Sequence, residues 1–337
     1  MNLQLISRPA PPGVPRETAG VLGGAWLGVV QEIAPPEWPV QRILAPVFGS
    51  TAESLEETWL ADSDLSSGFS EGIVWCRAGG LLYGVLELDE ATFAPVAGAT
   101  SLQLATTEAY RRIFRLLAAQ NLPNLWRVWN YLAEINQESS GLERYRQFNV
   151  GRQDAFLEFQ HCVTGNAPAA CALGLAGGPL SIAFMAGEQP AVPVENPRQV
   201  SAYNYPAEYG PRSPTFSRGA LVYLPGQEIL FISGTASIVG YQTVHSGDVL
   251  AQCDESLTNV ASVVAEANRL NRSIPFALGD FSYRAYVRHA GDFAGIQTLL
   301  ADRLGTDAEI VYVQADICRN DLLIEIEAMA SHSLETS

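Results

Sequence analysis

One order of elements occurs twice along this chain, and it limits the possible folds more than any other feature. In each half, apolar spacing predicts a helix, a strand, a second helix and then a hairpin of two paired strands. In the first half these segments are 100–121, 125–135, 141–156 and 167–186. In the second half they are 254–270, 281–289, 291–305 and 309–330, with the last turn near Arg319 and Asn320. The repeat predicts an α+β protein with two similar units, each a mixed sheet backed by helices.

Local signals predict where these elements begin and end. Asp254 is expected to cap one helix, while Asp292 and Gly305 are expected to begin and end the next. Further strands are predicted near 21–30 and 73–88, and the Pro- and Gly-rich start is predicted to be an arm or loop. We therefore expect an N-terminal unit at 1–187, a Pro/Tyr-rich connecting segment at 188–218 that contributes to the site, and a C-terminal unit at 219–337.

Charge and composition exclude several classes of partner. The chain has 337 residues, of which 47% are apolar and 17% are charged, so it can bury a large core. Its 36 acidic residues against 20 Lys and Arg give a net charge of -16. Such a surface argues against nucleic acid or an anionic membrane as a partner, because both attract basic proteins. A small anionic ligand is still compatible with this net charge, since a few buried arginines can determine the electrostatic field at its binding site.

Targeting signals and metal-binding patterns are not recognisable. No run of about 18 apolar residues occurs, and the start of the chain lacks the pattern of a secretion signal. The five cysteines contain no CxxC pair and the four histidines are scattered. We therefore expect free thiols in the cytoplasm, no metal site and no cofactor.

The last predicted strand carries two acids on one face. In RNDLLIEIEA, Glu325 and Glu327 alternate with Ile324, Ile326 and Ala328. The pattern alone leaves two interpretations of Glu325: a solvent-facing acid, or a carboxyl in an apolar pocket whose raised pKa makes it a general acid. When the two halves are aligned by their ends, Ser181 stands where the second half has Glu325, which favours a special role for this acid.

Arginine and tyrosine gather in two short windows. The first, GLERYRQFNVGR, contains Tyr145 and Arg152, and the second, YNYPAEYGPRSPTFSRG, contains Tyr203, Arg212 and Arg218. Arginine binds a carboxylate with two parallel hydrogen bonds, and tyrosine adds a neutral donor. These windows therefore favour a small dicarboxylate, although surface ion pairing is the alternative for each residue. No phosphate-binding glycine motif occurs.

The C-terminal half resembles the RidA/YjgF superfamily. The resemblance lies in EILFISGTASIVG, in GDVLAQCDESLTNVASVVAEAN and in ICRNDLLIEIEAMA, and it implies a helix-backed mixed sheet with ligand sites at subunit contacts. Ile317 or Cys318 occupies the place of the arginine that binds the substrate carboxylate in imine-hydrolysing members. This departure argues against imine deamination.

Nearly the whole chain is similar to the chorismatases. NYLAEINQESSGLERYRQFNVGRQDAF, YPAEYGPRSPTFSRG and the SGTASIVG block carry this resemblance. It implies two RidA-like (chorismate-mutase-like) units, the first degenerate, that act on chorismate and release pyruvate. In that family the catalytic acid is the glutamate of the last strand, here Glu325. Members that make 3-hydroxybenzoate have a cysteine seven residues earlier, here Cys318.

The resemblance implies roles for the other candidates and leaves alternatives. Arg152 and Arg218, with Tyr145 and Tyr203, are expected to bind the two carboxylates of chorismate, and Arg212 ranks second. Cys318 is either a packed small side chain or a residue that shapes the reaction. The alternatives to 3-hydroxybenzoate synthesis are hydrolysis to a dihydroxycyclohexadiene carboxylate and a RidA-like protein that binds a small acid without turnover. A site between the two halves makes a monomer possible, and a RidA-like trimer is the other arrangement.

Overall fold

The computed structural model of this chain describes residues 2–10, 19–29, 37–50, 53–161 and 164–334. Within these residues, two mixed sheets and a smaller third sheet account for most of the strands. Four α-helices cover the outer faces of the two mixed sheets. None of the helices in the described part of the chain is long and apolar enough to cross a membrane.

The first mixed sheet has six strands in the order β12-β9-β13-β8-β7-β6. The strand bounds are β6 Leu65–Ser70, β7 Ile73–Ala78, β8 Leu81–Leu88, β9 Asn124–Ala133, β12 Ala169–Leu175 and β13 Leu180–Gly187. Helices α1 (Ser101–Gln120) and α2 (Arg144–Glu158) pack on one face of this sheet. Helix α1 begins with a side-chain cap from Thr100, and Asn121 in the left-handed conformation ends it.

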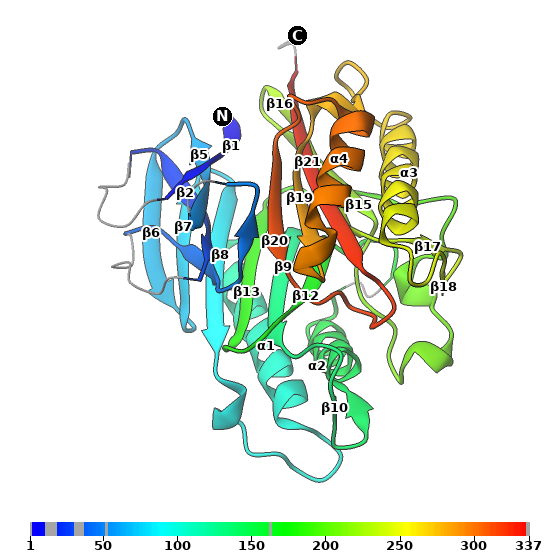
Figure 1. Cartoon of the computed structure of the whole chain (residues 1–337). Coiled ribbons are helices and arrows are strands. Elements are labelled where there is room, and N and C mark those ends of the chain that lie inside the picture. Colours follow the sequence, from blue (N-terminus) through cyan, green and yellow to red (C-terminus); the bar gives the residue numbers. More distant parts are fainter. Residues whose placement is uncertain (1, 11–18, 30–36, 51–52, 162–163, 335–337) are drawn as a thin grey trace.

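The second mixed sheet has seven strands in the order β14-β15-β16-β21-β19-β20-β4. The strand bounds are β4 Val47–Phe48, β14 Val192–Val194, β15 Gly219–Leu224, β16 Gln227–Thr235, β19 Ser282–Val287, β20 Ile310–Gln314 and β21 Ile324–Ser333. Helices α3 (Val249–Ala267) and α4 (Phe293–Leu304) pack on one face of it, and Figure 1 shows them side by side on one flank of the molecule.

A third sheet of four strands, in the order β1-β5-β2-β3, joins the interior between the two mixed sheets. Its strands are β1 Leu3–Pro9, β2 Val21–Gly28, β3 Val40–Ile43 and β5 Ser54–Ala61. Two short ribbons, β10 (Glu138–Ser139) with β11 (Leu142–Glu143) and β17 (Ile238–Val239) with β18 (Gln242–Thr243), complete the strands. Short 3-10 helices span η1 Glu90–Thr92, η2 Ala202–Asn204, η3 Ala207–Tyr209, η4 Leu278–Asp280 and η5 Ala290–Asp292.

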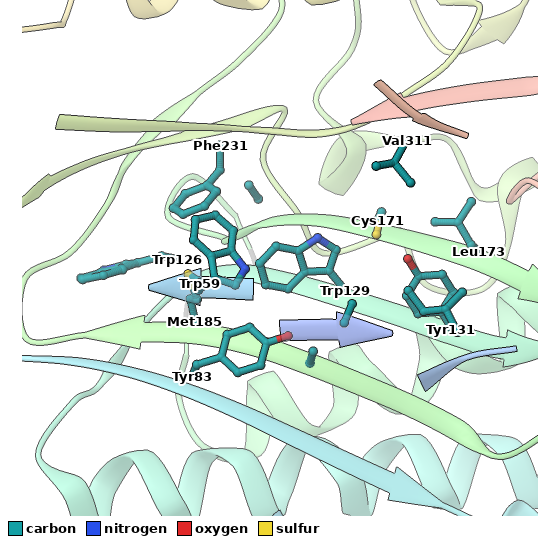
Figure 2. Packing of buried hydrophobic residues seen from close by; sticks show 14 of the residues in the cluster. Trp59, Tyr83, Trp126, Trp129, Tyr131, Cys171, Leu173, Met185, Phe231 and Val311 are labelled. Carbon is teal, nitrogen blue, oxygen red and sulfur yellow. The ribbon is translucent and has the colours of Figure 1, made fainter. Parts of the chain in front are cut away.

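The helix-free faces of the two mixed sheets bury a common aromatic core. Trp59 of the third sheet lies between Trp129 of the first sheet and Phe231 of the second, with ring centroids 6.3 and 5.9 Å apart (Figure 2). Tyr83 packs on Trp129 from the other side at 6.1 Å. Because large aromatic side chains bury much apolar area, this contact holds the two halves face to face.

The two halves repeat one topology. In each, the central strand is flanked by a parallel and an antiparallel neighbour: β12-β9-β13 in the first half and β20-β19-β21 in the second. Ser181 pairs with Tyr131, and Glu325 pairs with Tyr286, so Ser181 and Glu325 occupy equivalent positions as the sequence alignment predicted. The two equivalent tyrosines meet between the sheets, with hydroxyl oxygens 2.6 Å apart.

Three local expectations are corrected by the structure. The two strands that close each repeat are not paired with each other, because β9 or β19 lies between them. The cap of α3 is Asp248, whose side chain accepts a hydrogen bond from the Ala251 amide, while Asp254 lies inside the helix. Residues 3–9 of the expected arm form β1, because they pair with β5 along its whole length. Residues 11–18 of that arm lie outside the described part of the chain.

We expect Gly187→Ala to destabilise the first sheet. A Cβ at Gly187 would overlap the ring of Trp126, whose indole NH is fixed by a hydrogen bond to Gln189 O. Such overpacking costs about 1–3 kcal/mol, so the midpoint of chemical unfolding should fall. Gly177→Ala is the matched control, since a Cβ there meets nothing within 4 Å. Equal midpoints for the two variants would contradict this packing.

Candidate active site

A pocket of about 750 Å³ opens between the two halves, and we call it the central pocket. Its walls come from the loop before α2, from the connecting segment, from β16 and from the loop between β20 and β21. Predicted residues that line it are Tyr145, Arg218, Cys318 and Glu325. Arg152 lines a small cavity that shares Tyr145, Cys318 and Glu325 with this pocket.

Glu325 is a buried acid at the inner end of the central pocket. Its neighbours Ile324 and Ile326 point to the helix side of β21, so the strand period places Glu325 on the side that faces the other sheet. Only 3% of the residue is exposed. Burial first, and the charge of Glu327 second, raise the pKa of Glu325 to about 8, against the opposing charges of Arg127 and Arg218. The carboxyl is therefore largely protonated at neutral pH.

Gly234 on β16 makes room for this carboxyl. A Cβ at Gly234 would overlap Glu325 Oε1 and would also lie 3.1 Å from Cys171 Cβ. The small residues of SGTASIVG thus permit a close approach of the β16 backbone. The close approach is to the acid itself.

Two buried arginines of the site form no close ion pair among the described residues. Arg152 and Arg218 are 2% and 4% exposed, and neither forms an ion pair in the described part of the chain. Arg152 Nη2 donates to Asn149 Oδ1 at 2.8 Å, and Arg218 Nη2 donates to Val200 O at 3.0 Å. The Nε atom of each has no hydrogen-bond partner. Because an unpaired buried charge is costly, these groups favour an anionic ligand.

Tyr205 and Arg319 are lining residues that sequence reasoning missed. Tyr205 OH accepts a hydrogen bond from Arg218 Nη2 at 2.8 Å. The guanidinium of Arg319 lies over the rings of Tyr205 and Tyr209, at 5.3 and 4.3 Å from their centroids. Both residues lie in or beside the quoted motifs, but only the folded chain brings them together.

Two other candidates lie outside the lining of the central pocket. Tyr203 is half-buried two residues before Tyr205 and does not line the pocket. Arg212 is exposed and lies 3.8 Å from Asp154 on α2. The site therefore combines Glu325, Cys318, Tyr145, Arg152 and Arg218, while Tyr203 and Arg212 stand apart.

Cys318 and Tyr145 are neutral groups beside the acid. Burial, and then the charge of Glu325, raise the pKa of the Cys318 thiol to about 12. Burial, and then Cys318, also raise the pKa of Tyr145. Since the thiolate is the nucleophilic form, Cys318 is not poised to attack. Among the described residues no group of three or more His, Cys, Asp or Glu could hold a metal ion.

This arrangement can donate a proton to a bound dianion. Arg152 and Arg218 offer two positive charges, and Glu325 offers an acidic proton between them and the interior. A carboxyl with a pKa near the working pH is well suited to general acid catalysis. The geometry thus defines an acid catalyst for a small anionic molecule, built from both halves of one chain.

Comparison with known proteins agrees with the fold. A family model described as Chorismatase FkbO/Hyg5-like, N-terminal, matches residues 57–186. A chorismatase of Streptomyces rapamycinicus is 37% identical over 286 residues, which is 83% of each chain. A 3-hydroxybenzoate synthase of Streptomyces hygroscopicus is 34% identical over 323 residues, which is 90% of this chain and 91% of the relative. The crystal structure of a chorismatase is similar with a TM-score of 0.86 and 32% identity, covering 98% of this chain and 99% of the other.

Two α+β units of like topology that share one pocket define the class of this protein. Within that class, the chain belongs to the chorismatase family. The resemblance inferred from the sequence motifs is thereby confirmed.

We expect Glu325→Gln to stabilise the fold at alkaline pH. A carboxyl whose pKa is raised in the folded state, here from 4.5 to about 8, binds more protons folded than unfolded between these values. Stability therefore falls as pH rises through that window, and the loss is complete above it. At pH 9 the variant should unfold at a higher denaturant concentration than the parent, and its free energy of unfolding should be greater by up to several kcal/mol. This difference in free energy should shrink toward pH 4. A constant difference across this range would refute the buried neutral acid.

Proposed function

We propose that this protein converts chorismate to 3-hydroxybenzoate and pyruvate. The observation that carries the proposal is the buried Glu325, whose pKa is raised, facing a pocket with two buried arginines, neither of which forms an ion pair among the described residues. Chorismate has two carboxylates and a vinyl ether that joins its ring to an enolpyruvyl group. The arginines match the carboxylates, and the acid matches the vinyl ether. The relatives named chorismatase and 3-hydroxybenzoate synthase support the same activity.

The carboxylates of the substrate would be bound from both halves of the chain. Arg152 on α2 and Arg218 before β15 each have an Nε–H free for an anion, and Tyr145 supplies a neutral donor. Tyr205, whose hydroxyl accepts a hydrogen bond from Arg218, joins these binding residues. It takes the role that the sequence analysis assigned to Tyr203. Losing one such arginine would leave a substrate charge unpaired, and truncations of this kind cost about 2–5 kcal/mol of binding.

The first chemical step is protonation of carbon. Glu325 donates its proton to the terminal methylene of the enolpyruvyl group, which becomes a methyl group. The electron pair of the carbon–carbon double bond forms the new bond, and positive charge develops on the ether carbon and oxygen. The glutamate anion left behind stabilises this oxocarbenium ion, because a buried carboxylate interacts strongly in a low dielectric.

The oxocarbenium ion can react by two routes. If the ring hydroxyl attacks the ring carbon that carries the ether, the bond from that carbon to the ether oxygen breaks and pyruvate leaves with its electron pair. The hydroxyl proton returns to the Glu325 carboxylate, the ring can become aromatic, and 3-hydroxybenzoate and pyruvate form without net consumption of water. If water attacks, a dihydroxycyclohexadiene carboxylate and pyruvate form with one water consumed. We assign the first route to this protein, because the buried neutral Cys318 occupies the wall beside Glu325 and helps to exclude water.

The organisation of the molecule fits a self-contained catalyst. We propose that the units 1–187 and 219–337, with the connecting segment 188–218, each contribute part of the site, so that one chain is sufficient and a monomer is the working form. Tyr145 and Arg152 come from the first unit, Arg218 from the connecting segment, and Cys318 and Glu325 from the last unit. We also propose a cytoplasmic location, where free thiols such as Cys76, Cys171 and Cys253 stay reduced.

Glu325→Gln is expected to abolish pyruvate release from chorismate while the protein stays folded. The amide has a similar shape but cannot give a proton to carbon, and one positioned acid contributes about 10²–10⁴-fold or more. Pyruvate is measured with a coupled assay and folding by circular dichroism. Glu188→Gln, at a side chain that is 57% exposed outside the central pocket, is the control and should keep full activity. Turnover by the Glu325 variant, or binding of chorismate by the parent without any pyruvate, would favour a non-catalytic binding protein.

Cys318→Ala is expected to shift the products toward the dihydroxycyclohexadiene carboxylate. The smaller side chain leaves space beside Glu325 into which water enters, so attack by water competes with the internal route. The ratio of the two ring products is measured by chromatography at equal pyruvate yield. Cys253→Ala, which removes a buried thiol of α3 itself, is the matched control. If the ratio is unchanged in the Cys318 variant, this residue has no part in product choice.

A further inference from the structure

A second set of buried ionised side chains lies next to the acid, and it is outside the central pocket. We call Glu57, Arg127, Arg284 and Glu327 the charge cluster, and they are 4%, 2%, 8% and 6% exposed. They come from β5, β9, β19 and β21, and they surround a separate small cavity between the sheets. Neither the binding of substrate carboxylates nor the proton donation described above uses any of them.

The charge cluster is internally paired. Glu327 forms ion pairs with both arginines, and its Oε1 lies 3.2 Å from Arg284 Nη1. Arg284 also pairs with Glu57 of the third sheet. The indole NH of Trp129 donates to Glu327 Oε1 at 3.1 Å. Two positive and two negative charges therefore cancel within one connected group.

Glu327 is the member that lies closest in sequence to the acid. Glu325 and Glu327 project from the same face of β21, and residues two apart on a strand are about 6.6 Å apart. Cys171 Cβ lies near Gly234, against the Glu325 carboxyl, so the wall on this side is apolar. The cavity that borders the cluster has a volume of about 40 Å³, far less than that of the central pocket. In such a medium a charge change in the cluster acts on Glu325 with little screening.

We propose that Glu327 is a positioning residue for the acid step, because it compensates Arg127 and Arg284 and thereby lets Glu325 keep its proton. This inference rests on the proposed function and adds a determinant of its pH range. Without Glu327, two arginines would be left with Glu57 alone, and the excess positive charge would favour the anion of Glu325. With Glu327 in place, the local field from the interior is close to balanced.

Other ionisable groups also face Glu325, and they set the background against which the cluster acts. They are Tyr286 from β19, Cys171 from β12, Cys318 from the loop before β21, Tyr145 and Arg152 from α2, and Arg218 from just before β15. The cysteines and tyrosines among them have raised pKa values and are neutral. Among the groups just named, Arg152 and Arg218 are the charged ones, and bound substrate would neutralise them.

Opposite shifts in the pH profile test the charge balance. A general acid works when protonated, so turnover falls as pH rises through the pKa of Glu325. Glu327→Gln leaves the cluster with one excess positive charge and should move this falling limb about one to two pH units lower. Arg127→Gln leaves one excess negative charge and should move the limb in the opposite direction. The double variant restores neutrality, and its limb should return to within a few tenths of a unit of the parent.

Glu228→Gln is the matched control for removal of a buried acid. Glu228 is fully buried on β16, opposite His332 at the far end of β21, and it accepts hydrogen bonds from the amides of Arg272 and Ser273. The variant should lose stability without moving the limb. If Glu327→Gln fails to fold, the Arg127→Gln and double variants still test the charge balance. The falling limb of the pH profile should move to higher pH in Arg127→Gln and should return in the double variant. Shifts in one direction only, or losses of rate at an unchanged limb, would mean that the cluster is merely structural.

A titration that needs no turnover separates this inference from the proposed function. The carboxyl carbon of Glu325 is followed by NMR in protein labelled with ¹³C-glutamate, and its signal is identified by its loss in Glu325→Gln. Its midpoint should move down in Glu327→Gln and up in Arg127→Gln. If the parent releases no pyruvate from chorismate, the proposed function is refuted, while these midpoints still confirm or refute the coupling. Unmoved midpoints would overturn the inference even in an active enzyme.

Discussion

The face-to-face packing of two mixed sheets is the constraint on which the rest of this molecule depends. Each sheet covers one face with helices, so the other face must be buried elsewhere. Trp59, Trp129 and Phe231 join the two remaining faces into one core. This packing removes residue 325 from water and brings α2 of the first half beside β21 of the second. Both the raised pKa of the acid and the nearness of the arginines follow from that single contact.

The repeat explains why the site is asymmetric in a nearly symmetric frame. Tyr131 and Tyr286 are equivalent, and they meet through their hydroxyl groups. The positions beside them differ, since Ser181 is small and neutral where Glu325 is acidic. Ser181 Oγ accepts from Gln41 in the first half, whereas the Glu325 carboxyl faces the central pocket. One frame thus supplies a packed polar contact in one half and a proton donor in the other.

Much of this could be predicted from sequence, because the predictions used local information. Helical spacing placed α1, α2, α3 and α4, and the strand period placed Glu325 and Glu327 on one face. Strand neighbours were predicted wrongly, since a strand inserted between two sequential ones leaves no local signal. Tyr205 and Arg319 were missed because their roles depend on where the connecting segment folds back. The charge cluster was missed for the same reason, although Arg127 and Arg284 within apolar strands were a usable sign of buried ion pairs.

The coexistence of unpaired arginines and a protonated carboxyl in one pocket needs a physical reason. Arginines near a carboxyl normally lower its pKa, and Arg127 and Arg218 do act in that direction on Glu325. Burial opposes them and is the larger effect, and Glu327 adds to it by neutralising Arg127. The arginines on the pocket side are left for the ligand, and the arginines on the interior side are already paired. Separating positive charge in this way lets one small site bind an anion and hold a proton at the same pH.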